Sequence, residues 1–191
     1  VEMFKKKGVE IIYTLEPIDA FVLNHLGSYR EKKLVSADRA DLDLSKTADK
    51  QEDSAASPQQ EPWAADSLEQ LCTWMKEVLG ERVQAVKASS RLVDSPAMIV
   101  NVDGFMSSSM ERLLKASGQD GFGMGGKKDM EINAGSPLIK KLAALKESDT
   151  DFAADLAWQI YDNARIQAGL DVDPMEMVRR NYRILDRAAG Q

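Results

Sequence analysis

The stretch DPMEMVRRNYRIL, residues 173–185, decides how the C-terminal part of this chain folds. Asp173 is a suitable N-cap, Pro174 suits the first helical position, and Glu176 completes a capping box, so a helix is predicted to begin here. Within it, apolar side chains recur at alternating steps of three and four residues, which is the spacing of a heptad seam. The seam residues are Met175, Val178, Tyr182, Leu185 and Ala189.

A second apolar line runs beside that seam and consists of Met177, Ile184 and Ala188. Together the two lines make an apolar surface wider than one neighbouring helix covers. We therefore expect part of the terminal helix to contact a second chain. The alternative is that all of it packs inside the monomer.

The preceding segment, Thr150 to Gly169, predicts another amphipathic helix, with Gly169 in the position of a C-terminal cap. Its apolar stripe recurs every four residues at Phe152, Leu156, Ile160 and Ala164. We expect two such helices from each of two chains to form an interface like a four-helix bundle. Its predicted residues are Phe152, Leu156, Ile160, Met175, Val178, Tyr182, Leu185 and Ala189.

The region before these helices alternates between helical and extended patterns, which favours an α+β fold with a small β-sheet packed against helices. A helix with a capping box is expected from Asp66 or Ser67 to Gly80. The further expected elements are strands over 83–89 and 97–102 split by a turn at 94–96, a helix from Ser108 to Gly118, and a short apolar segment over 137–145.

Residues 36–66 have the composition of an acidic flexible linker. They carry eight Asp or Glu residues against three Lys or Arg, and residues 47–62 contain no aliphatic or aromatic side chain larger than alanine. This divides the chain into a first piece, 1–35, and a body, 67–191. The first piece predicts a strand over 9–15, a helix opening at Pro17 and a short strand over 33–36, too little to fold alone.

Composition limits the chemistry that this chain can perform. With 191 residues, a net charge of −6, one cysteine and one histidine, it offers no disulfide and no Cys/His metal site. No stretch is apolar for long enough to span a membrane, and no basic excess points to nucleic acid. The chain begins at Val1 and its first residues read as the approach to a strand, so we expect a piece of a longer protein.

The glycine-rich stretch GFGMGGKK, residues 121–128, resembles the opening of a phosphate-binding P-loop. Lys128 stands where the hydroxyl that holds Mg²⁺ is required, and a helix ending in Gly118 precedes the loop instead of a buried strand. We therefore interpret it as a loop whose Phe122 and Met124 contact another protein. A nucleotide-binding enzyme that uses Gly121 to Lys127 is the alternative.

Several motifs, in order, give the chain a family resemblance. RLVDSPAMIV (91–100), SMERLLKAS (109–117), KKDMEIN (127–133) with Pro137, and DPMEMVRRNYRIL (173–185) resemble the C-terminal domain of the heat-shock protein 90 chaperones. FKKKGVEIIYTLEPIDAFVLNHL (4–26) resembles the end of that family's middle domain. The resemblance implies a homodimer formed by the last two helices and an exposed segment that contacts unfolded or partly folded clients.

Carried over to this sequence, the resemblance and the loop composition give the client-contacting residues Phe105, Met110, Leu113, Leu114, Phe122 and Met124. It also implies that ATP and Mg²⁺ belong to parts of the parent chaperone absent here, so we expect no catalytic residue or cofactor in this piece. The sequence does not show the acidic tail by which some family members recruit tetratricopeptide cochaperones. In this it resembles a cytoplasmic bacterial member of the family or, alternatively, an organellar one. A purely structural dimer module without clients is a further alternative.

Overall fold

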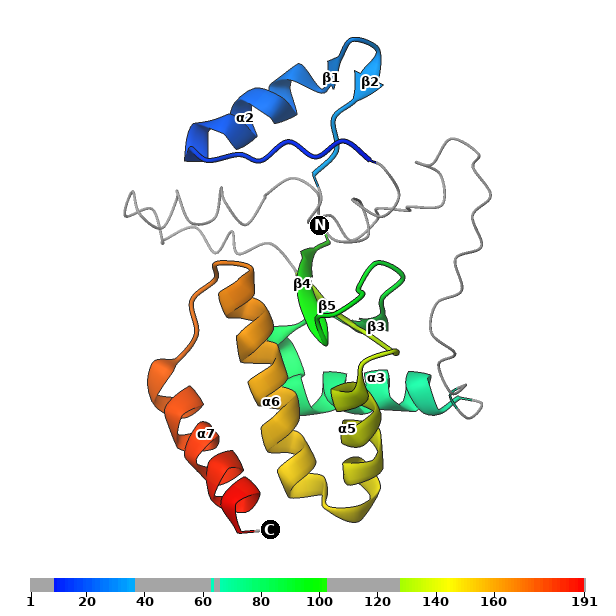
Figure 1. Ribbon diagram of the computed structural model, residues 1–191, viewed down its shortest axis with the longest axis vertical. Helices are drawn as coiled ribbons and strands as arrows, with labels where there is room; N and C mark the ends of the chain where they lie inside the picture. The colour runs from blue at the N-terminus through cyan, green and yellow to red at the C-terminus, as the bar shows by residue number, and fades with distance from the viewer. Residues whose placement is uncertain (1–8, 37–62, 64–65, 103–127, 191) are drawn as a thin grey trace.

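The computed structural model describes residues 9–36, 63, 66–102 and 128–190 (Figure 1). Within these ranges the fold is α+β, as the sequence predicts. The elements are α2 (Pro17–Leu26), β1 (Ser28–Tyr29), β2 (Lys32–Lys33), α3 (Ser67–Leu79), the 3-10 turn η1 (Gly80–Arg82), β3 (Val86–Ala88), β4 (Ala97–Asn101), β5 (Lys128–Ile132), α5 (Pro137–Ser148), α6 (Thr150–Gln167) and α7 (Pro174–Ala189).

The sheet of the body has the order β3-β5-β4, so β5 is central although it comes last in the sequence. β3 runs parallel to β5, with Val86 opposite Met130, whereas β4 runs antiparallel, with Ile99 opposite Met130. Because side chains alternate between the faces of a strand, one apolar face is formed. It consists of Val86, Ala97, Ile99, Met130 and Ile132, all buried in the core with α3, α5 and α6.

Helix α3 occupies the span that the sequence predicts, and its residues Leu71, Met75 and Leu79 are almost fully buried. The capping box predicted for Asp66 is wrong. Asp66 has φ 65° and its side chain makes no capping hydrogen bond, because an N-cap residue needs extended backbone for its side chain to reach the first free N–H groups. Gly80, at φ 58°, ends the helix as expected.

Two elements of the body differ from the sequence-based expectation. Residues 137–148 form the full helix α5, with Pro137 in its first turn and Ile139 and Leu142 fully buried. The strand β5 was not predicted as a strand. Its sequence, KDMEI, is mostly charged, and it becomes a central strand because Asp129 and Glu131 occupy the face of the sheet opposite the core.

The N-terminal piece also differs from the prediction. The helix that opens at Pro17 is present, and Asp19 Oδ2 accepts hydrogen bonds from the backbone N–H groups of Leu15 and Glu16. Residues 9–15 form no strand, because no other strand lies beside them in the described part of the chain. The predicted strand over 33–36 is replaced by the hairpin of β1 and β2. This piece is thus a helix and a hairpin.

Trp63 shows where the body begins. Its indole N–H donates a 2.9 Å hydrogen bond to the carbonyl of Ala134, and its ring packs against the core. Cys72 is a buried free thiol on α3.

Candidate dimerisation surface

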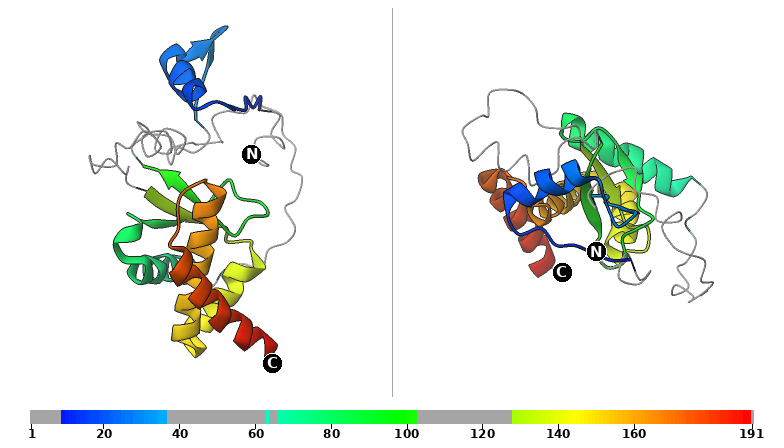
Figure 2. Two further views of the ribbon diagram at one scale, coloured as in Figure 1. Left: turned by 90° about the vertical axis from the view of Figure 1, so that its left-hand side faces the viewer. Right: turned by 90° about the horizontal axis from the view of Figure 1, so that it is seen from above.

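Helices α6 and α7 lie side by side at the C-terminal end of the body (Figures 1 and 2). A six-residue connection, 168–173, joins them, and Asp173 caps α7 by accepting hydrogen bonds from the N–H groups of Met175 and Glu176. Both helices begin and end close to the predicted boundaries.

Arginine–aspartate pairs connect the two helices along their length. Arg180 Nη1 donates to Asp162 Oδ2 at 2.6 Å, and both side chains are buried. One turn further along α7, Arg183 donates two hydrogen bonds to the carboxylate of Asp155, of 2.7 and 2.5 Å. After a further turn Arg187 pairs with Asp149. Because the arginine numbers rise as the aspartate numbers fall, the helices are antiparallel.

Aromatic rings of α6 complete this contact. The guanidinium of Arg180 lies 5.5 Å from the ring centroid of Trp158, and that of Arg187 lies 4.5 Å from that of Phe152. The hydrogen bonds to Asp155 raise the pKa of Arg183 above its ordinary value, so the charge persists at any physiological pH. The face of α7 that meets its own chain is therefore largely cationic.

The seam predicted from the sequence lies on the other face of α7. Exposed fractions are 64% for Met175, 50% for Val178, 64% for Tyr182 and 54% for Leu185, and Ala189 is exposed as well. At about 100° per residue, the seam is centred nearly opposite the arginines. The helix thus turns three arginines toward its own body and the predicted seam away from it, whereas Met177 and Ile184 of the second apolar line are half-buried.

The predicted residues of α6 occupy different environments. Ile160 is 5% exposed and belongs to the core of the single chain, whereas Phe152 and Leu156 are half-buried. Ile166, on the same helix, is 50% exposed and was not among the predicted residues. The four-residue spacing finds an apolar stripe, but it does not distinguish a core residue from a surface one.

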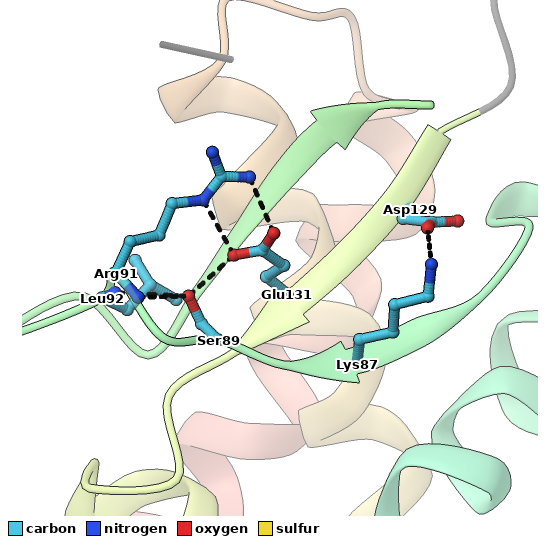
Figure 3. Close-up of polar contacts among 6 residues, drawn as sticks. All are labelled: Lys87, Ser89, Arg91, Leu92, Asp129 and Glu131. Atoms are coloured by element: carbon cyan, nitrogen blue, oxygen red, sulfur yellow. Dashed lines mark hydrogen bonds and ion pairs between the residues drawn. The ribbon is translucent and has the colours of Figure 1, made fainter. Parts of the chain in front are cut away.

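The polar face of the sheet brings two of the quoted sequence motifs together (Figure 3). Arg91 donates two hydrogen bonds, of 3.0 and 2.7 Å, to the carboxylate of Glu131, 40 residues away. Ser89 Oγ donates to the same carboxylate at 2.7 Å and accepts from the N–H groups of Arg91 and Leu92. Beside it, Lys87 Nζ lies 2.5 Å from Asp129.

The next motif residue, Asn133, holds the predicted turn. Its Nδ2 donates to the carbonyls of Val93 and Ser95, at 2.9 and 3.2 Å. Its backbone N–H donates to the carbonyl of Pro96. Residues from two of the stretches that carry the resemblance, 91–100 and 127–133, therefore tie β5 to the segment before β4.

Comparison with known proteins decides the family. A family model described as Hsp90 protein matches residues 1–190. The chain belongs to the Hsp90 family. Among relatives, "Chaperone protein HtpG" of Desulfotalea psychrophila is 55% identical over 100% of this chain and 30% of its own length. Those of Desulfitobacterium hafniense and Shewanella amazonensis are 38% and 36% identical, over 98% and 100% of the chain and 29% of their own lengths.

The chain thus spans about 30% of the length of these Hsp90 relatives. The predicted client-contacting residues lie outside the described residues. So does the glycine-rich loop, 121–128, except for Lys128. In the described ranges, no group of three or more His, Cys, Asp or Glu side chains could hold a metal ion. No helix in those ranges combines the length and apolarity needed to cross a membrane.

The arginine face of α7 is the feature that sequence reasoning missed. A signal for it was present, because Arg180, Arg183 and Arg187 share one helical face and aspartates recur at positions 149, 155 and 162. Repeated opposite charges on two consecutive helices indicate which faces meet.

Proposed function

We propose that this chain is the C-terminal dimerisation and client-contacting part of an ATP-dependent Hsp90 chaperone that helps unfolded or partly folded proteins to fold. The observation that carries the proposal is the orientation of α7. Its arginine face is engaged by α6, whereas Met175, Val178, Tyr182 and Leu185 are each at least half exposed. A regular apolar line that faces away from its own body is typical of an interface.

A two-fold arrangement suits this surface. In such a dimer each chain contributes the same patch, and α6 and α7 of the two chains form a bundle of four helices. Burying the exposed half of four large side chains contributes about 1 kcal/mol for each, so about 8 kcal/mol for the pair of chains. The entropy lost on association is of the same order. Additional area from Phe152, Leu156 and Ile166 of α6 is therefore part of the proposal.

The client role rests on family membership and on composition. We assign client contact to the apolar residues Phe105, Met110, Leu113, Leu114, Phe122 and Met124. ATP and Mg²⁺ bind, in this proposal, to the portion of the parent chaperone that the chain does not span, and this piece performs no catalysis. The bacterial relatives favour the bacterial cytoplasm as the place of action.

Cysteine cross-linking tests the symmetric interface. Cysteine is placed in turn at Met175, Val178, Tyr182 and Leu185 in a Cys72→Ala background, and the protein is oxidised at low micromolar concentration. Near a two-fold axis a residue meets its own copy, so at least one position is expected to give a disulfide-linked dimer. Cysteine at the exposed residue Ala144 of α5 is the control. Equal, slow cross-linking at every position contradicts the interface.

Suppression of aggregation tests the client role separately. The chain is added to a chemically unfolded model protein as it is diluted into buffer, and light scattering is recorded. We expect the wild type to reduce scattering, and the double variant Met110→Ser, Leu114→Ser to lose this effect while its dimer persists. A variant that holds the client as well as the wild type supports the purely structural alternative. Fluorescent ATP titration addresses the nucleotide-binding alternative.

A further inference from the structure

A groove runs between helix α3 and strand β3, on the far side of β3 from β5. It encloses about 770 Å³. Five consecutive residues, 84–88, line it, and they comprise β3 and the two residues before it. Because consecutive side chains of a strand point to opposite faces of the sheet, a lining of five in a row shows that the groove follows the edge of the strand.

The edge of β3 in this groove has unpaired backbone groups. In the parallel ladder the carbonyl of Ala85 accepts from Met130 and the N–H of Ser89 donates to the carbonyl of Ile132. The residues that alternate with these, Val86 and Ala88, therefore direct their N–H and C=O groups away from β5. β3 is an edge strand, and within the described residues nothing pairs with that edge.

The wall opposite the strand combines apolar and acidic side chains. Leu68 and the buried Cys72 lie in the groove, and the exposed carboxylates of Asp66 and Glu69 stand at its rim. Glu77 extends the acidic surface along α3 in an adjoining hollow that shares Asp66 and Glu69.

The two lysines of the groove are already engaged. Lys76 Nζ donates to the backbone carbonyls of Gly80 and Val83, and Lys87 Nζ pairs with Asp129. Lys76 keeps its positive charge, because the carbonyls it contacts are neutral, but Asp66 and Glu69 outnumber it. Among the described residues the lining of the groove therefore has a net negative charge, which favours a cationic occupant.

We propose that the groove between α3 and β3 binds an extended, basic segment of another polypeptide by adding it as a strand to the edge of β3. The outward N–H and C=O groups of Val86 and Ala88 supply the main-chain hydrogen bonds, as in other cases of strand addition. Alternate side chains of the bound segment point toward Leu68 and Cys72 and are apolar. A lysine or arginine of the segment reaches Glu69.

This site is separate from the proposed dimer surface and does not depend on it. Its residues belong to α3 and β3, whereas the dimer surface belongs to α6 and α7. The peptide measurements below are therefore repeated on the Leu185→Asp variant, where unchanged peptide binding is expected even if the chain has become monomeric.

The probe is a fluorescein-labelled eight-residue peptide of alternating valine and lysine, titrated with the 191-residue chain and followed by anisotropy. One control peptide alternates valine and glutamate. A second keeps the valine and lysine side chains but carries N-methyl groups on consecutive amides, which removes the N–H groups along both edges. We expect saturable binding of the first peptide only. Equal binding of the N-methylated peptide overturns strand addition.

Matched variants locate the site. Ala88→Pro removes one outward N–H without breaking a ladder hydrogen bond, because proline is tolerated on strand edges. Ala88→Val keeps that N–H and is the control. Ala88→Pro is expected to weaken peptide binding about tenfold and Ala88→Val less than about twofold. Glu69→Lys is expected to reverse the preference between the lysine and glutamate peptides, while Glu81→Lys, outside the groove, leaves it unchanged.

The remaining outcomes also decide the matter. If Ala88→Pro does not fold by circular dichroism, the comparison of methylated and unmethylated peptides on the wild type is decisive. If Ala88→Pro and Ala88→Val bind the peptide equally, or no peptide binds up to its solubility limit, the proposal is wrong. If Ala88→Pro lowers self-association of the chain instead of peptide binding, the occupant of the edge is a second copy and the proposal is likewise wrong.

Discussion

Arg180 and Asp162 form a buried ion pair at 2.6 Å that joins the last two helices across 18 residues of sequence. Each side chain is about 9% exposed, so neither charge is compensated by water. The pair fixes the rotation of α7 about its axis, because any other rotation leaves a charged group buried without a partner. The same rotation turns Leu185 outward.

Removing one partner of that pair tests this role. Asp162→Ala leaves the Arg180 charge buried and uncompensated, so a loss of about 3–5 kcal/mol in the free energy of unfolding is expected. Urea denaturation followed by circular dichroism measures it. Asp155→Ala breaks the more exposed pair with Arg183 and serves as the control, with a much smaller loss expected. Equal losses for the two variants contradict the view that Arg180 fixes the helix.

The pair of Arg91 and Glu131 is expected to anchor the segment before β4. Their side chains are 4% and 12% exposed, so Glu131→Ala is expected to cost roughly 3 kcal/mol. Replacing both partners by apolar residues, as in Arg91→Met with Glu131→Leu, is expected to recover much of this loss. Thermal melting of the two variants gives the comparison. A double variant less stable than Glu131→Ala contradicts this expected recovery.

The hydrogen bond from Trp63 to Ala134 is expected to hold the start of the body in place. Trp63→Phe keeps an aromatic ring but leaves that carbonyl without its donor, so a loss of about 1 kcal/mol is expected in urea denaturation. Trp74→Phe is the matched control, since Trp74 packs against the same core and its indole donates no hydrogen bond within the described residues. No difference between the two variants would show that the bond is unimportant.

Cys72 gives the stability a dependence on alkaline pH. Burial raises the pKa of its thiol above 9.0, and the charge of Glu69 adds to the effect. At pH values between the pKa of the unfolded state and that of the folded state, the folded state binds more protons. The contribution of Cys72 to the free energy of unfolding is therefore complete below pH 9.0 and is lost as the pH rises through the folded pKa. The melting temperature of the wild type relative to Cys72→Ala is expected to fall as the pH rises above 9.0. A constant difference contradicts this.

Helix positions were predictable where local signals agreed with packing. In α7 the N-cap, the proline and the heptad spacing all come from neighbouring residues, and the helix begins at Pro174 as expected. β5 was missed because a strand such as KDMEI is recognised by its partners, which lie about 30 and 44 residues earlier in the sequence.

Only part of the candidate dimerisation surface could be predicted from the sequence. The seam of α7 was found because all of its members share one environment, whereas Ile160 and Leu156 fall on one stripe but differ in burial. Which face of α7 meets its own body depends on pairs such as Arg183 with Asp155, 28 residues apart. Local periodicity contains no information on such pairs until the helices are placed together.

The oligomeric state of the Leu185→Asp variant tests the central claim most directly. The 191-residue chain has a mass of 21.1 kDa, and multi-angle light scattering at tens of micromolar is expected to give twice that mass for the wild type and for the control Ala144→Asp. Leu185→Asp places a carboxylate in the interface twice per dimer, which is expected to cost several kcal/mol of association, so its mass should be that of one chain with an unchanged circular dichroism spectrum. A monomeric wild type, or a Leu185→Asp variant that dimerises with unchanged affinity, contradicts the account.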